Sequence, residues 1–263
     1  MRLALSSTVA GLVAAFAASS AWSVGPTPGF QPSGILAPER QVRYVAVANG
    51  TQTAVEAVQI GSGRVLHSIW LDAVYGVPLV AYDGTAGGLT RDGKLLVVST
   101  AGADASTSFV VLDAKRMRLR SAISLKGMWA FDALSPEGRT LYLTQIVSTD
   151  GPVRYLVRAY DLERGRLLPG AIADKSERGA MTGYPMSRVV SADGRWAYTL
   201  YARTNGTAFI HALDTRGRRA VCLDLTGRGN MDFGRTRLTL TRDGLRLVVH
   251  RPGGKTESVP VPR

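Results

Sequence analysis

The stretch LSPEGRTLYLT (residues 134–144) sets a polar turn between a short apolar run and a strand-like run. Pro136 suits the first central position of a tight turn because its ring fixes φ, and Gly138 adopts a φ that other residues resist. Leucine and tyrosine follow the turn, as expected for a strand that is half or fully buried. The stretch therefore predicts a β-hairpin.

The same pattern recurs around the chain. LTRDG (89–93) precedes LLVVST, VSADG (190–194) precedes WAYTLY, and a second LTRDG (240–244) precedes LRLVV. A weaker copy begins at Leu36, with Arg40 in the position of the glycine. The turn positions 40, 93, 138, 194 and 244 lie about fifty residues apart, which indicates stacked repeat units that share one core.

Two further signals have the same period, within units that we expect to hold four strands, A to D. Glycine-containing turns join strand B to strand C at Asn49-Gly50, Asp150-Gly151 and Asn205-Gly206. An aspartate closes strand C at Asp113, Asp161 and Asp214, where we expect it to cap the next turn by accepting backbone hydrogen bonds. The sequence therefore predicts an all-β protein, a β-propeller of about five four-stranded blades.

The last unit and the longest spacing depart from this regular plan. Residues 237–263 hold strands A and B but only a short candidate for strand C at 259–261. We expect the N-terminal segment to close the ring by adding an outer strand to the last blade; otherwise the ring stays open. The longest spacing places an insertion at residues 169–183, which we expect to be a surface loop between blades.

The N-terminus carries the pattern of an export signal. Arg2 is followed by an apolar run, residues 3–18, and then by Ser19-Ser20-Ala21, the small-residue spacing of a signal-peptidase site. We expect a signal peptide at 1–21, a linker rich in proline and glycine at 22–33, and the propeller domain at 34–263. An uncleaved N-terminal anchor is the alternative. No later apolar run approaches the ~20 residues that span a bilayer, so we expect a secreted or cell-envelope protein without a membrane span after the signal segment.

The chain is strongly basic, with a formal net charge of +12. Such a charge is typical of proteins with anionic partners, such as wall polymer, lipid head groups or nucleic acid. Most of the basic residues are arginines, a bias that a GC-rich genome also produces, and they are not gathered in one tail. An evenly basic surface is therefore the alternative. Cys222, the single cysteine, lies in a strand-like run and is expected to be a small buried hydrophobe.

Ser135-Pro136-Glu137-Gly138 followed by Leu141-Tyr142-Leu143 resembles the repeats of YVTN-type β-propellers, and Ala192-Asp193-Gly194 with Tyr198 is the next most similar copy. The resemblance covers roughly residues 34–250. It implies a secreted bacterial propeller built from such blades and no particular activity. The chain departs from the family at Arg40 and in having fewer units than the seven usual for it.

Candidate site residues lie before and within the expected A strands. In propellers, ligands usually meet the face that carries the D-to-A and B-to-C loops. Asp132 and Arg188 stand at equivalent positions in adjacent units, which predicts an ion pair facing the channel, with Trp129 and Tyr184 as an aromatic rim above it. Aromatic rings beside paired charges suit a sugar, an aromatic small molecule or a peptide. A purely structural pair between blades is the alternative.

Asp232 and Arg235 complete the predicted set of ligand-binding residues, in the last unit. Catalytic and metal signals are poor, because the three histidines show no metal spacing and no nucleophile-elbow, phosphate-loop or zinc-hydrolase motif is present. The sequence thus favours a non-catalytic propeller that binds a protein, glycan or small molecule through one face, without a cofactor, a metal or specific nucleic acid. The alternatives are a lactonase-like propeller hydrolase and a basic envelope protein that charge holds to an anionic polymer.

Overall fold

The computed structural model describes residues 29–101, 105–150, 152–174, 179–227, 232 and 235–262. The expected signal peptide and most of the expected linker lie outside this part of the chain. Apart from a 3-10 turn at Pro252–Gly254, the regular structure in the described residues consists of β-strands, so the expected all-β class is confirmed. None of these residues belongs to a helix with the length and hydrophobicity to cross a bilayer.

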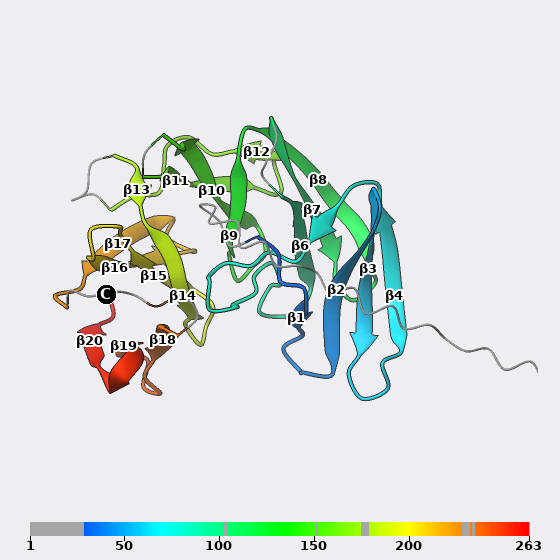
Figure 1. Ribbon diagram of the computed structural model, residues 1–263. Coiled ribbons are helices and arrows are strands. Elements are labelled where there is room, and N and C mark those ends of the chain that lie inside the picture. Colours follow the sequence, from blue (N-terminus) through cyan, green and yellow to red (C-terminus); the bar gives the residue numbers. More distant parts are fainter. Residues whose placement is uncertain are drawn as a thin grey trace, which may run out of the picture.

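Antiparallel sheets follow one another along the described chain and around an arc (Figure 1). The first sheet holds β1 (Ile35–Leu36), β2 (Val42–Asn49), β3 (Gln52–Gln59) and β4 (Val65–Leu71). The second holds β5 (Tyr75–Gly76), β6 (Leu95–Thr100), β7 (Ser106–Asp113) and β8 (Arg118–Lys126). The third holds β9 (Trp129–Leu134), β10 (Thr140–Ser148), β11 (Arg154–Asp161), β12 (Arg166–Leu167) and β13 (Met181–Thr182).

The two remaining sheets complete the arc. The fourth holds β14 (Tyr184–Val190), β15 (Trp196–Ala202), β16 (Ala208–Asp214) and β17 (Arg219–Asp224), and the fifth holds β18 (Arg237–Leu240), β19 (Arg246–His250) and β20 (Thr256–Pro260). The third strand of the fifth sheet is thus longer than the expected 259–261. Figure 1 shows β9, β14 and β18 on the inner side of the arc, with the later strands of each sheet further out.

The turns between strands A and B have the backbone that the repeat predicts. The residues in the glycine position all have positive φ, namely Arg40 (59°), Gly93 (66°), Gly138 (67°), Gly194 (74°) and Gly244 (71°). The hydroxyl of Ser135 accepts the Thr140 N–H at 3.1 Å, which joins the turn to the start of the next strand. Arg40 therefore occupies a true copy of the turn, although side chains disfavour this conformation.

The aspartates that end strand C cap the following turns, as expected. Asp113 accepts the Arg116 N–H at 3.0 Å, Asp161 accepts the Arg164 N–H at 2.9 Å, and Asp214 accepts the Gly217 N–H at 2.9 Å. These aspartates have a structural role in the turns.

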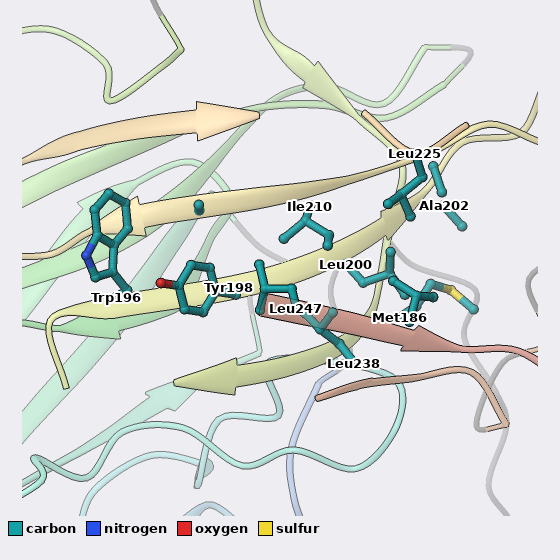
Figure 2. Packing of buried hydrophobic residues seen from close by; sticks show 12 residues of the cluster. Met186, Trp196, Tyr198, Leu200, Ala202, Ile210, Leu225, Leu238 and Leu247 are labelled. Carbon is teal, nitrogen blue, oxygen red and sulfur yellow. The ribbon is translucent and has the colours of Figure 1, made fainter. Parts of the chain in front are cut away.

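The core lies between neighbouring sheets. Figure 2 shows the cluster where Met186, Leu200 and Ile210 of the fourth sheet meet Leu238 and Leu247 of the fifth. Fully burying a side chain of this size stabilises the fold by about 1.5–3 kcal/mol. The sheets are therefore held face to face by apolar side chains.

The segment at 169–183 is more than the surface loop that the sequence predicted. The Ile172 N–H donates to the Val157 carbonyl at 2.7 Å, and β13 pairs with β11 at Arg154 and Tyr155. The segment therefore returns to the outer edge of the third sheet, where it supplies hydrogen-bond partners that an edge strand otherwise lacks.

The described part of the N-terminal segment does not add a strand to the last sheet. Ile35 and Leu36 form the inner strand of the first sheet, and Phe30 makes an isolated bridge with Pro78 of the second unit. The expected closure of the ring would rest on residues before 29, which lie outside the described part of the chain.

Candidate functional site

A segment of the second unit leaves its sheet and enters the middle of the arc. β5 ends at Gly76, and pairing with β6 resumes only at Leu89, so that residues 77–88 form an excursion, which we call the inner loop. The Tyr82 N–H donates to the Pro185 carbonyl of β14 at 2.9 Å. The inner loop thus connects the second sheet to the fourth.

Asp83 holds the tip of the inner loop in place. Its carboxylate accepts the Thr85 N–H at 2.9 Å and a hydrogen bond from the Ser187 hydroxyl of β14. The buried Ser187 oxygen also accepts the Leu238 N–H at 2.8 Å. The hydrogen bond from Thr85 closes the turn at the tip, as aspartates often do in turns. Through Ser187, the tip is also hydrogen-bonded to the fourth and fifth sheets.

A cavity of about 300 Å³ lies between the inner loop and the inner strands β9 and β14. Its walls are mainly apolar, with Val80, Phe131, Leu134 and Val190 among them. The turns between strands A and B also contribute to the lining, through Pro38, Thr90, Arg91, Pro136 and Gly194. This central cavity therefore lies at the end of the inner strands where those turns gather, not at the face that the sequence analysis expected.

The predicted ion pair between Asp132 and Arg188 is present and lines the central cavity. The Arg188 guanidinium donates to the carboxylate and to the backbone carbonyl of Asp132, and its Nε donates to Thr199 Oγ1 at 2.8 Å. The side chains of Asp132 and Arg188 are only 3% and 6% exposed. The pair is therefore a buried, multiply hydrogen-bonded contact between the third and fourth sheets.

One carboxylate oxygen of the ion pair forms no hydrogen bond to the part of the chain that the structure describes. Asp132 Oδ2 is buried and has no hydrogen-bond partner in the described residues. A buried carboxylate oxygen without a partner is unfavourable, so a donor that reached this atom would gain a hydrogen bond. A second cavity, of about 20 Å³, is lined by Asp132, Tyr155 and Arg188.

The aromatic groups behind the ion pair are uncharged at neutral pH. Burial lowers the pKa of His211 to about 4, and burial raises the pKa values of Tyr155 and Tyr201 well above the usual 10. The two tyrosine rings stack at 5.6 Å, and His211 Nδ1 lies 3.9 Å from the sulfur of half-buried Cys222. This neutral layer extends the low-dielectric surroundings of the ion pair.

The other predicted site residues lie elsewhere. Trp129 is buried in the core of the second and third sheets and donates its indole N–H to the Lys126 carbonyl at 2.9 Å. Tyr184 packs edge to face against Tyr82, with ring centroids 6.5 Å apart, and does not line the central cavity. The expected aromatic rim above the ion pair is therefore not formed.

Asp232 and Arg235 pair with each other rather than with the central residues. Their side-chain atoms approach to 3.7 Å on the surface. Among the predicted set, only Asp132 and Arg188 lie together at the central cavity. No group of three potential metal-binding side chains occurs in the part of the chain that the structure describes.

The contribution of the inner loop to the cavity was missed by sequence reasoning. A side chain at Gly87 would lie 2.6 Å from both Phe131 and Val80, so glycine is required where the loop passes the wall. The long spacing before Gly93 and the Gly87-Gly88 pair were signals of an excursion in this unit.

No family model matches the chain, and no curated protein matches it. Among solved structures, it is similar to the hydrazine synthase of Kuenenia stuttgartiensis, with a TM-score of 0.51 and 16% identity over 92% of this chain and 69% of that chain. It is similar to the Dos1 propeller (TM-score 0.50, 10% identity, 84% of this chain and 53% of that chain). A putative TolB from Agrobacterium tumefaciens gives a TM-score of 0.50 at 14% identity, over 88% of this chain and 81% of that chain. At these identities the likenesses show the fold alone, and that fold is β-propeller-like.

Proposed function

We propose that this chain is an exported, non-catalytic β-propeller that binds a ligand or partner through its central cavity. The observation that carries the proposal is that Asp132 lines the cavity and that its buried Oδ2 has no hydrogen-bond partner in the described residues. A ligand N–H or O–H would supply the missing bond, while Phe131 and Leu134 would cover its apolar part.

The cavity favours a compact, largely apolar ligand. About 300 Å³ is at the lower end of the range of about 300–1,000 Å³ typical of small-molecule sites. An aromatic molecule with one amine or hydroxyl, or an apolar side chain of a partner protein, suits these walls. A sugar suits them less well, because its many hydroxyls would find few polar partners.

The proposal includes finer points of architecture and location. Each of the five sheets in the described residues would be one blade of a YVTN-type ring, and residues before 29 would close the ring at the last sheet. Export would follow from the signal peptide expected at residues 1–21. Sequencing the N-terminus of the protein recovered outside the cell membrane tests this location, and an intact Met1 there would exclude cleavage.

A hydrolase would need a nucleophile and a base at the cavity. Within the described residues, the Ser187 hydroxyl is engaged by Asp83 and Leu238, and His211 is not among the lining residues. Binding is therefore the function that this arrangement supports best.

Ligand-observed NMR with benzylamine, benzyl alcohol and toluene tests the proposal. We expect benzylamine and benzyl alcohol to bind about tenfold more tightly than toluene, because only they can donate to Asp132. Val190→Trp should abolish binding by filling the cavity mouth, since Val190 is half exposed and lines the cavity. Val147→Trp, at a similarly exposed position away from the cavity, is the matched control.

Two outcomes would overturn this assignment. If Val190→Trp binds benzylamine as the natural sequence does, then the central cavity is not the site. If toluene binds as tightly as the two donors, then Asp132 Oδ2 is satisfied by water and does not select the ligand.

A further inference from the structure

The turns of neighbouring sheets gather on one face of the molecule. In a four-stranded antiparallel sheet the A-to-B and C-to-D turns lie at the same end. A side chain at Gly93 would lie 3.1 Å from Pro38 of the preceding A-to-B turn, and one at Gly194 would lie 3.6 Å from Pro136. These turns therefore form one continuous surface, which we call the A–B face.

Unpaired positive charge is concentrated on the A–B face. Exposed basic residues of its turns that form no ion pair within the described residues include Arg40, Arg91, Lys115, Arg118, Arg166 and Arg218. The net charge of +12 is thus not spread evenly, as one interpretation of the sequence had it.

Within the described residues, the opposite face holds fewer exposed basic residues without an ion pair, among them Lys126, Arg154 and Lys255, and three of its arginines are neutralised by ion pairs. Arg203 pairs with Asp224 at 3.5 Å, Arg235 pairs with Asp232 at 3.7 Å, and Arg251 pairs with Glu257 at 2.9 Å. The difference between the faces sets the direction in which an anionic surface would attract the molecule.

Apolar side chains are exposed among the arginines of the A–B face. Ile60 and Val65 flank the C-to-D turn of the first sheet and are 47% and 45% exposed. Leu119 follows Arg118 and is 55% exposed, and Leu245 follows the turn glycine of the fifth sheet and is 62% exposed. A soluble polyanion would require only the charges, whereas the interface of a bilayer also accepts the leucines.

We propose that the A–B face docks on a bilayer that contains anionic lipids. The arginines bind lipid phosphates, for which the guanidinium geometry is well suited, and the exposed leucines enter the head-group region. This docking is independent of the ligand in the central cavity, although the cavity lies at the same end of the inner strands.

Flotation of the full chain with vesicles tests the proposal. We expect strong binding to vesicles of phosphatidylcholine with phosphatidylglycerol and weak binding to phosphatidylcholine alone. Each basic residue removed from the A–B face should weaken the partition about fivefold, so Arg118→Gln with Arg218→Gln should weaken it about 25-fold. Every variant is made in the full chain, so that any contribution of residues 3–18 to vesicle binding is the same in all of them.

Matched variants separate a directed surface from net charge. Lys126→Gln with Arg154→Gln removes the same charge from exposed positions away from the A–B face and should change the partition less than threefold. Leu119→Ser with Leu245→Ser should weaken binding at unchanged charge, by about tenfold. Circular dichroism melts confirm that each variant is folded.

Two results would overturn the proposal. If both charge variants lose the same affinity, then net charge alone attracts the protein and no face is selected. If the leucine variant binds normally and soluble polyphosphate releases the protein completely, then the partner is a polyanion and not a membrane.

Discussion

Two buried aspartates, one in the centre of the molecule and one at a corner of the fourth sheet, have opposite hydrogen-bonding states. At the corner, Asp214 Oδ1 accepts bonds from Arg195 Nε at 3.0 Å and the Gly217 N–H at 2.9 Å, and Oδ2 accepts bonds from Arg195 Nη2 at 2.7 Å and Arg219 Nε at 3.2 Å. In the centre, Asp132 uses one oxygen for Arg188 and leaves the other without a partner in the described residues.

The difference separates a structural carboxylate from a candidate binding group. Burial by itself raises the pKa of Asp214, but the hydrogen bonds from Arg195, Gly217 and Arg219 outweigh it and hold that pKa well below 3.8. A carboxylate with all its acceptor positions filled has nothing left for a ligand. The free oxygen of Asp132 is the feature that a purely structural ion pair does not need.

The largest expected effect is that of Asp132→Ala. This change leaves Arg188, whose side chain is 6% exposed, as an uncompensated buried charge, which costs about 3–5 kcal/mol of unfolding free energy. Urea unfolding measures the loss. Adding Arg188→Met should restore more than half of it, because the buried charge is then removed as well. A double variant no more stable than Asp132→Ala would show that the loss has another origin.

The next largest expected effect is the pH dependence of the unfolding free energy that is due to His211, a residue of the same central region. Burial lowers the pKa of His211 to about 4, with Asp132 opposing and Arg188 reinforcing the shift, whereas the unfolded chain binds this proton near 6.5. The unfolded state therefore takes up more protons between these values, and stability falls as the pH drops from about 6.5 to about 4, by about 3 kcal/mol.

His211→Gln should flatten the unfolding free energy across that pH window. His67→Gln, at an exposed position on β4, is the matched control and should retain the slope. A slope that survives in His211→Gln would mean that another group titrates there.

Asp214→Ala should have a smaller effect than Asp132→Ala. Its partners Arg195 and Arg219 are 39% and 50% exposed, so they can return to water when the carboxylate is removed, and we expect a loss of about 2 kcal/mol. Because the folded-state pKa is lowered, this stability is present above about pH 3.8 and is lost as the pH falls further.

Unfolding curves at about pH 6 and about pH 2.5 check the Asp214 prediction. The natural sequence and Asp214→Ala should differ most at the higher pH, and the difference should be smaller at the lower one, where part of the contribution of the carboxylate is lost. Asp224→Ala, which removes the exposed partner of Arg203, is the control and should cost less than about 0.5 kcal/mol. Equal losses for Asp214→Ala and Asp132→Ala would remove the contrast between the two carboxylates.

The repeat and the ion pair between Asp132 and Arg188 could be predicted from the sequence. Turn residues and the aspartates ending strand C identified the sheets, because their hydrogen bonds are made within a few residues. The equivalence of Asp132 and Arg188 in adjacent units then located the ion pair. A repeat predicts such contacts because each unit places its residues in the same position against its neighbour.

The inner loop and the position of Trp129 could not be predicted in the same way. Residues 77–88 leave a strand and bind β14, more than a hundred residues later in the chain, through Asp83 and Ser187. Trp129 has an aromatic side chain that suits either a rim or a core, and only the packing of the second sheet against the third decides between them. Both outcomes depend on tertiary contacts, which leave no periodic signal.

The smallest expected effect concerns Arg40, where the repeat keeps its turn without its glycine. The same turn has glycine at its other copies, and a left-handed backbone costs a side-chain residue about 1 kcal/mol. Arg40→Gly should therefore stabilise the protein by about 0.5 kcal/mol, measured by urea unfolding, because relief of the backbone strain outweighs the greater freedom that glycine gives the unfolded chain. This gain contrasts with the losses at Asp132 and Asp214. Arg242→Gly, at a turn position without positive φ, should instead destabilise it by several tenths of a kcal/mol through the greater freedom of the unfolded chain. If both glycine variants lose stability, then Arg40 makes contacts that outweigh its backbone strain.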